Sequence, residues 1–126
     1  MRLQEIREIL DGQMIIAPQD WDMEIRMVCG CDLMSDVLAF TKEDSLLLTG
    51  LTNLQVVRTA EIANIKALVF VRGKEPDRET IALAMAKNIP LMVTQFPMYE
   101  ACGRLYQRGL PGCSEVEEGS GAENGR

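Results

Sequence analysis

The fold is decided by residues Ser45–Gly73, SLLLTGLTNLQVVRTAEIANIKALVFVRG. This stretch begins with a short apolar run, Ser45–Thr49, which has no helical period and which Gly50 ends. A helical pattern follows over about Leu54–Ala63, and a second apolar run, Ala67–Val71, comes after it. Two continuously apolar strands that flank a helix are typical of a βαβ unit, because a parallel strand is covered on both faces.

The sequence after this stretch repeats the order of strand and helix. A helix that Asp77 caps is followed by an apolar run, Leu91–Val93, and then by a final helix over about Met98–Arg108. Repeated βα units predict a mostly parallel sheet with helices on both faces and right-handed crossovers. For the last three helices we expect these residues on the buried faces: Leu54, Val57, Ala60 and Ile62; Ile81, Met85 and the alanines near them; Cys102, Leu105 and Tyr106.

The first part of the chain adds shorter elements to this α/β pattern. Leu3, Ile6 and Leu10 recur at helical spacing, and Met14–Ile16 is a brief apolar run. Met23–Cys29 alternates between apolar and polar residues, which predicts a strand near the edge of the sheet, and a short helix is expected over Val37–Phe40. We expect one domain over residues 1–110 and a disordered acidic tail over residues 111–126, which has little apolar area to offset chain entropy.

Composition excludes several classes of function. The chain has 126 residues, a net charge of −6 and a pI near 4.7, which argues against nucleic acid and against an anionic membrane surface. It contains no histidine, so catalysis by Ser-His-Asp or Cys-His groups is excluded. No apolar run approaches the roughly 20 residues that a membrane-spanning helix needs. We therefore expect a cytoplasmic protein with reduced cysteines.

Ligands of open parallel sheets bind beyond the carboxyl ends of the strands, where the turns lead into helix N-termini. Free N–H groups at a helix N-terminus suit an anion such as phosphate or carboxylate. The best candidate is the turn Thr49–Asn53, with Arg72 as a second donor. The candidate ligand-binding residues in these turns are Asp32, Ser35, Thr49, Gly50, Thr52, Asn53, Arg72, Gly73 and Thr94.

Each of these groups also has a purely structural interpretation. Thr52 or Asn53 can cap the helix that follows them. Asp32 and Asp36 could form a magnesium or acid–base pair; alternatively Asp32 or Ser35 caps the next helix, and Asp36 lies in its first turn, where the helix dipole favours a negative charge.

Four cysteines present a similar choice. Cys29 and Cys31 are two residues apart, so on a strand they point to one face and could bind a soft metal together with Cys102 and Cys113, or form a redox couple. The spacing lacks the second C-x-x-C of a zinc ribbon. We expect a buried reduced pair that behaves as small apolar residues, with no metal and no cofactor.

Several blocks of the chain together resemble the DRTGG domain family. They are VCGCDLMSDVL (Val28–Leu38), LLTGLTN (Leu47–Asn53), VRTA (Val57–Ala60), KALVFVRG (Lys66–Gly73) and ACGRLY (Ala101–Tyr106). The resemblance spans about residues 1–110. Where relatives tend to have Gly-Asp-Arg and Thr-Gly-Gly, this chain has Gly50-Leu51-Thr52 and Val71-Arg72-Gly73.

This resemblance implies a fold similar to the N-terminal domain of HPr kinase/phosphorylase. The family also occurs inside some phosphotransacetylases and between CBS domains of regulated pyrophosphatases. It implies a non-catalytic, regulatory or ligand-sensing accessory domain that forms homodimers and binds a nucleotide or another phosphate-bearing metabolite. The alternatives are an adaptor that binds another protein, for example in a redox or hydrogenase system, with a vestigial pocket, and a small transferase.

Overall fold

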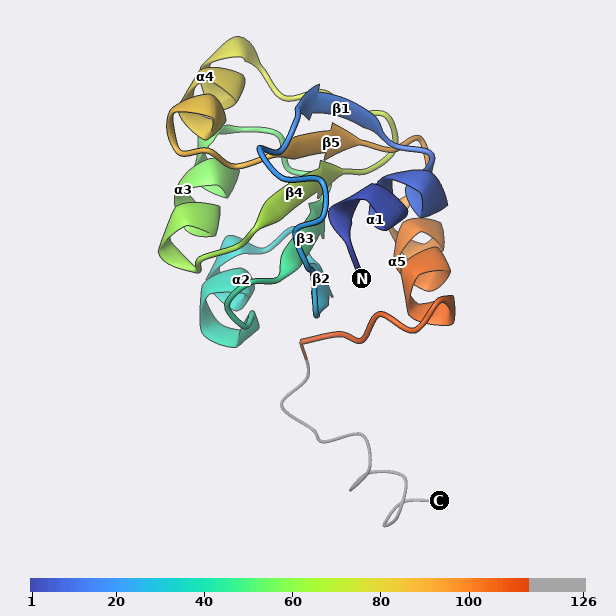
Figure 1. The fold of residues 1–126 in the computed structure, drawn as a ribbon. Coiled ribbons are helices and arrows are strands. Elements are labelled where there is room, and N and C mark those ends of the chain that lie inside the picture. The colour runs from blue at the N-terminus through green and yellow to red at the C-terminus, as the bar shows by residue number, and fades with distance from the viewer. Residues whose placement is uncertain (114–126) are drawn as a thin grey trace.

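A computed structural model gives the fold, and residues 1–113 are the part of the chain that it describes. These residues form one five-stranded sheet in the order β1-β5-β4-β3-β2. β2 to β5 are parallel to one another, and β1 is antiparallel to β5 (Figure 1). The strands are β1 (Gln13–Ile16), β2 (Val28–Gly30), β3 (Leu46–Thr49), β4 (Ala67–Phe70) and β5 (Leu91–Val93).

Helices cover both faces of this sheet, as the repeated βα pattern predicts (Figure 1). The chain moves in one direction from β2 to β5, so crossovers of one hand place the three connecting helices on one face. The two helices that precede and follow these units cover the other face. The helices are α1 (Leu3–Leu10), α2 (Met34–Phe40), α3 (Leu54–Ile62), α4 (Arg78–Ala86) and α5 (Met98–Gln107).

The three interior strands are completely buried, and alternate residues along them pack on the two sides of the sheet. In β3, Leu46 and Leu48 pack with α1 and α5, whereas Leu47 packs with α2, α3 and α4. Every residue of β3, β4 and β5 is buried. The continuous apolar runs of the sequence thus reflect strands that are covered on both faces, and the predicted fold class is confirmed.

The predicted strand Met23–Cys29 is wrong in length. Only Val28–Gly30 pairs with β3, although β2 does lie at the edge of the sheet as expected. The preceding residues lie instead against the start of the chain, where the Ile25 N–H donates to the Met1 carbonyl at 2.7 Å. Their alternation arises because Ile25 is buried beside α1 while its two neighbours face solvent.

Three side chains predicted to lie on buried helix faces are exposed. Ile62, Met85 and Tyr106 are 69%, 58% and 64% exposed. Met85 and Tyr106 each follow a buried residue, so they lie about 100° around the helix from it, and Ile62 lies about 200° from buried Ala60. In α3 the buried set is Val56, Val57, Thr59 and Ala60, and Leu54 is half-buried.

The described part of the chain ends along the edge strand. The Val28 N–H donates to the Pro111 carbonyl at 2.9 Å, and Gly112 forms a parallel bridge with Val28. Cys113 follows, with its Sγ 3.1 Å from the Ser45 Oγ. Residues 111–113 therefore belong with the folded domain, and the remainder of the predicted acidic tail, residues 114–126, lies outside the described residues.

Candidate functional site

The carboxyl ends of the four parallel strands lie along one edge of the sheet. The register pairs Gly30 with Leu48, Thr49 with Phe70, and Phe70 with Val93. The turns that leave these strands are therefore neighbours, and they carry all of the predicted ligand-binding residues except Thr49, the last residue of β3, and Ser35, which lies in α2. Such an edge is where open parallel sheets bind their ligands.

Asp32 reaches across this edge to the turn after β3. Its Oδ1 accepts hydrogen bonds from the backbone N–H of Gly50 at 2.7 Å and from the Thr49 hydroxyl at 3.0 Å. The same hydroxyl accepts a hydrogen bond from the Leu51 N–H at 3.1 Å. The turn that the sequence offers as an anion cradle thus already holds an anionic group, which is the carboxylate of the chain itself.

This role of Asp32 corrects the structural interpretation of the segment before α2. The N-cap residue of α2 is Leu33, which makes no side-chain capping bond, so neither Asp32 nor Ser35 is the cap. Ser35 is exposed at the start of α2, and Asp36 lies in its first turn as predicted. Asp32 is unavailable as a cap because its carboxylate is bound to Gly50.

Asn53 caps α3, which confirms one of the two capping alternatives. Its Oδ1 accepts a hydrogen bond from the Gln55 N–H at 3.0 Å, and its backbone is extended, as is usual for an N-cap. Thr52 is half-buried. The Asn53 side chain is therefore fixed by α3.

The turn after β4 has an unusual backbone. The Lys74 N–H donates to the Val71 carbonyl at 3.2 Å, and Arg72 and Gly73 both have positive φ, 62° and 67°. Two successive positive φ values define a type I′ turn, which favours Asn or Gly at both positions. Of the five non-glycine residues with positive φ in the described part, Arg72 is the one that is neither Asp nor Asn.

Two further residues of this edge are absent from the sequence-based prediction. The Lys74 Nζ donates to the Gly50 carbonyl at 3.4 Å, which places an ammonium group beside the turn that holds Asp32. The Gln95 side chain lies over Gly73, where a Cβ would be 2.5 Å from its Oε1. The signal for both was their place at a predicted turn: Lys74 comes directly after Arg72–Gly73, and Gln95 belongs to the turn Thr94–Gln95 at the end of its strand.

Thr94 lies at the end of β5 but points into the core. It is fully buried, its hydroxyl donates to the Leu10 carbonyl at 2.7 Å, and it accepts from the Phe96 N–H at 3.3 Å. Both bonds join β5 to neighbouring segments of the same chain. The hydroxyl is thus committed to the fold, and the structure does not bring it together with Asp32 and Gly50.

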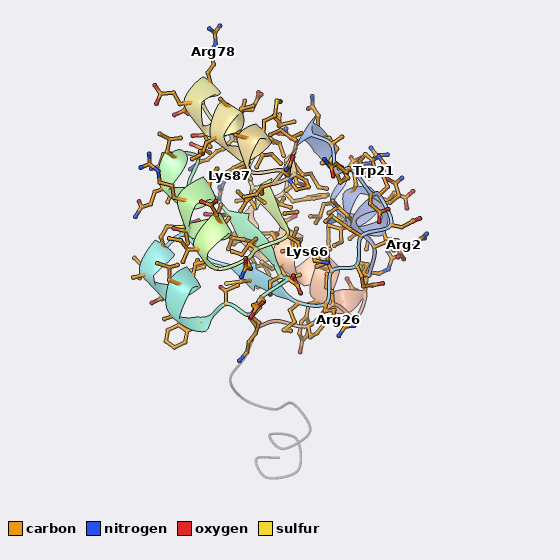
Figure 2. All side chains as sticks on the ribbon, turned by 60° about the vertical axis from the view of Figure 1, so that its left-hand side comes forward. Arg2, Trp21, Arg26, Lys66, Arg78 and Lys87 are labelled. Carbon is orange, nitrogen blue, oxygen red and sulfur yellow. The ribbon has the colours of Figure 1, made fainter. Side chains whose placement is uncertain are left out.

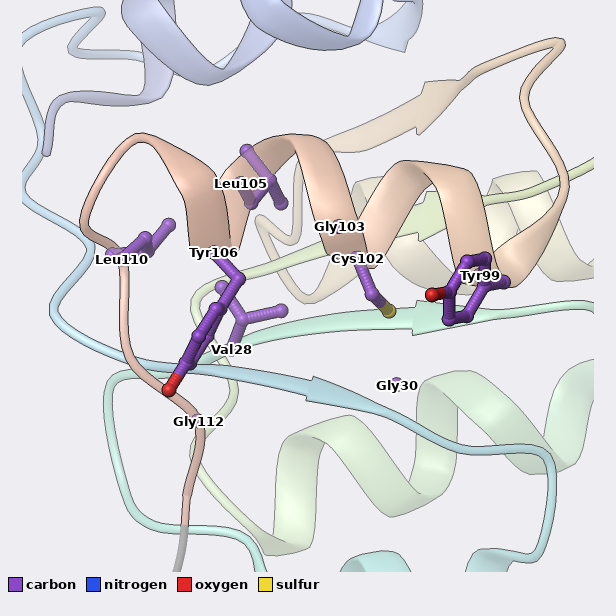
Figure 3. A pocket seen from close by; sticks show the side chains of 9 residues that line it. All are labelled: Val28, Gly30, Tyr99, Cys102, Gly103, Leu105, Tyr106, Leu110 and Gly112. Atoms are coloured by element: carbon purple, nitrogen blue, oxygen red, sulfur yellow. The ribbon is translucent and has the colours of Figure 1, made fainter. Parts of the chain in front are cut away.

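A separate apolar groove runs between α5 and β2 (Figure 3). Its volume is about 400 Å³. Tyr99 and Tyr106 extend from α5 at its two ends, and Cys102 points toward β2 between them. The other lining residues are Val28, Gly30, Gly103, Leu105, Leu110 and Gly112. The sequence does not reveal this groove, because it lies between elements about 70 residues apart along the chain.

The four cysteines are all unpaired and half-buried. Burial raises the pKa of the Cys29 and Cys102 thiols, which lowers their reactivity at neutral pH. Cys31 donates to the Leu33 carbonyl, with its Sγ 3.4 Å from the oxygen. Within residues 1–113, no group of three or more Cys, Asp or Glu side chains is placed to hold a metal ion.

One side of the molecule has dispersed basic side chains (Figure 2). Figure 2 shows Arg2, Arg26, Lys66, Arg78 and Lys87 spread over one side of the molecule. Two of them form ion pairs, Lys87 with Glu61 at 2.9 Å and Arg2 with Asp22 at 3.3 Å. This side therefore lacks the clustered basic patch that binds nucleic acid. Among residues 1–113, no helix has the length and apolar character needed to cross a membrane.

The fold and the edge define a class of protein: a small α/β domain with polar turns gathered at the carboxyl ends of its parallel strands. The chain belongs to the DRTGG domain family, whose model matches residues 5–107. A similar solved structure contains the CBS and DRTGG domains of the regulatory region of Clostridium perfringens pyrophosphatase, complexed with its activator, diadenosine tetraphosphate. It is 18% identical, with a TM-score of 0.73. The match covers 84% of this chain and 46% of that one.

Proposed function

We propose that this chain is a non-catalytic regulatory domain that senses a phosphate-bearing metabolite, such as a nucleotide, and acts as a homodimer in the cytoplasm. Membership of the DRTGG family supports the regulatory role. The similar pyrophosphatase structure supports the class of ligand, since that regulatory region is complexed with a dinucleotide. The proposed site is the carboxyl edge of the sheet between the turns after β3 and β4.

The backbone of Arg72 is the observation that carries this proposal. The left-handed conformation costs a residue with a Cβ roughly 1–2 kcal/mol, and among residues 1–113 no hydrogen bond or ion pair of the Arg72 side chain offsets this cost. Strained residues of this kind concentrate at functional sites. Arg72 and Lys74 are both exposed in the turn after β4, and Lys74 reaches the turn after β3, so this turn supplies two cationic side chains that could bind a phosphate.

Asp32 gives this site a second kind of recognition. Its Oδ1 is used by Gly50 and Thr49, while its Oδ2 has no hydrogen-bond partner among residues 1–113. A free carboxylate oxygen is a good acceptor for a hydroxyl group. Cations beside a carboxylate therefore favour a ligand that combines phosphate with hydroxyl groups, as a nucleotide does with its ribose.

We also propose that this site binds its ligand without catalysing a reaction. The sequence has no histidine, and burial raises the pKa of two of the four thiols. The hydroxyls of Thr49 and Thr94 are bound within the fold. We therefore assign binding, and no bond-making step, to this edge.

A thermal-shift experiment tests the sensing role. Inorganic phosphate, AMP, ATP and diadenosine tetraphosphate are each titrated to millimolar concentration against the wild-type chain and against the double variant Arg72→Asn/Lys74→Gln. Binding to the native state adds about 2.7 kcal/mol of stability at a ligand concentration 100 times its Kd, which raises Tm. We expect at least one nucleotide to raise the Tm of the wild type and to lose this effect in the double variant.

The matched control is Arg58→Gln, which removes one positive charge from an exposed position of α3. It should leave the ligand-induced shift unchanged. If none of the four compounds moves the wild-type Tm, sensing of nucleotides and phosphate is refuted and an adaptor role is favoured. An equal shift in the double variant would place the ligand elsewhere on the molecule.

A further inference from the structure

The outward face of α5 carries two exposed aromatic side chains. Tyr99 is 88% exposed, and Tyr106 follows it two helical turns later on the same side (Figure 3). Exposed Gly103 lies between the two tyrosines, at the spacing i, i+4, i+7 that keeps residues on one face of a helix. Hollows lie on both sides of this line: the groove toward β2, and a shallower one beside Glu100 and Arg104 with a volume of about 550 Å³.

Gly103 lies near the middle of this face and has no role in packing within the chain. A Cβ built at this position would meet no atom within 4 Å beyond the neighbouring backbone of α5 itself. Glycine inside a helix is less favourable than alanine, because it loses more conformational freedom on folding. Within the described residues, no contact offsets the loss of helix stability that glycine causes here. Close packing of another helix against α5 would offset it, because glycine lets the two backbones approach.

The charges on α5 are complementary to those of a second α5 in the opposite direction. Glu100 precedes Arg104 by one turn, and Arg104 is held in place over the Phe96 ring, with its Cζ 3.9 Å from the ring centroid. If two copies of α5 cross antiparallel between Cys102 and Gly103, Tyr99 of each copy meets Tyr106 of the other. Glu100 of each copy then lies within one turn of Arg104 of the other. Because the chain has a net charge of −6, two copies repel each other least when their interface does not bring acidic surfaces face to face.

We propose that the α5 face, Tyr99, Gly103 and Tyr106, is the self-association surface of this chain, and that its occupant is the α5 of a second copy. The inference rests on the homodimer proposed above and adds the location and symmetry of its interface. The two helices cross antiparallel about a two-fold axis, with the tyrosines of each copy in the hollows beside Gly103 of the other. An isologous interface of this kind needs one self-complementary patch, which α5 provides.

The test is the dissociation constant of the dimer, measured by sedimentation equilibrium of the full chain. Gly103→Leu has room within the monomer and improves helix propensity, so it should keep or raise Tm under dilute conditions where the chain is monomeric. The same substitution blocks the helix crossing and should raise the dissociation constant at least tenfold. Phe40→Ala is the matched control, since Phe40 is an exposed aromatic on α2, 55% exposed, and should leave the constant unchanged.

Charge reversal in α5 provides a second, independent test of the interface. Glu100→Arg places like charges across the crossing and should weaken the dimer, and Glu100→Arg/Arg104→Glu should restore it. A dimer that is insensitive to all α5 variants would overturn the α5 assignment while the homodimer stands. A wild-type chain that is monomeric at every concentration would overturn the homodimer itself. The nucleotide titrations above are read separately, so failure of sensing and failure of the interface are distinguished.

Discussion

The Asp32 carboxylate lies 2.7 Å from the backbone N–H of Gly50, eighteen residues further along the chain, and fixes the turn after β3. The same oxygen accepts from the Thr49 hydroxyl, so one side chain joins the turn after β2 to the end of the neighbouring strand. Lys74 donates to the Gly50 carbonyl, which brings the turn after β4 into the same cluster. Three successive βα turns are thus linked at the edge where we place the ligand.

Replacing Asp32 tests this link. Asp32→Ala removes the acceptor of two hydrogen bonds and should lower the free energy of unfolding by about 1–2 kcal/mol, measured by urea denaturation. It also exposes the Gly50 N–H and removes a negative charge beside Lys74, so inorganic phosphate should bind more tightly, measured by calorimetry. Asp32→Asn keeps an acceptor and should retain most of the stability. An alanine variant as stable as the wild type would contradict the link.

Arg72 predicts a conflict between stability and binding. Arg72→Asn puts a residue that tolerates positive φ into the turn, so it should raise the free energy of unfolding by up to about 1 kcal/mol. The loss of the guanidinium should weaken the binding of any nucleotide that stabilises the wild type. Denaturation and titration of the same variant check both effects. If Arg72→Asn is less stable than the wild type, or binds nucleotide with unchanged affinity, Arg72 has no role in ligand binding that would explain its strained backbone.

Local patterns in the sequence predict this fold well because its parallel strands are buried on both faces. The runs around Leu47, Leu68 and Met92 are continuously apolar and admit few alternatives. Helix faces are less certain, since an apolar side chain about 100° from the buried stripe looks like part of it, as Tyr106 does beside Leu105. The exposed tyrosine, which breaks the expected pattern, is a residue that we assign to an interface.

The candidate site was only partly predictable for a different reason. Its position follows from the strand order, and the turns at Gly50 and Gly73 can be read from the sequence. The contacts that decide what each side chain does join distant segments, as Asp32 does with Gly50 and Thr94 with Leu10. No periodicity or local turn rule specifies such pairs, because they depend on how the elements are arranged in space.

Asp77 predicts one component of the dependence of stability on pH. Hydrogen bonds from the Thr80 hydroxyl and from the Thr80 backbone N–H lower the pKa of this carboxyl in the folded state. Its contribution to stability is therefore fully present above the ordinary carboxyl pKa near 3.8 and is lost as pH falls through the lower folded value. Urea denaturation between pH 6 and pH 2.5 should show a shallower acid limb for Asp77→Asn than for the wild type.

Thr80→Val is the control for that assignment. It removes the hydroxyl donor and leaves the backbone donor, so it should flatten the acid limb in part. In the double variant Asp77→Asn/Thr80→Val, the second substitution should cause no change in the pH dependence beyond that of Asp77→Asn alone. Identical acid limbs in the wild type and in Asp77→Asn would show that other carboxyls determine acid unfolding.

Thr94 separates a structural hydroxyl from a ligand-binding one. Thr94→Val keeps the shape of the side chain but leaves the buried Leu10 carbonyl without its donor, which should cost about 1–3 kcal/mol of unfolding free energy. Nucleotide affinity of the folded variant should stay within about twofold of the wild type, because the hydroxyl points into the core and away from Asp32 and Gly50. Denaturation and titration below the Tm of the variant measure the two quantities. A variant that is as stable as the wild type but has lost its nucleotide affinity would show that Thr94 belongs to the ligand site, as the sequence predicts. The hydroxyl would then have to break its hydrogen bond with the Leu10 carbonyl when a ligand binds.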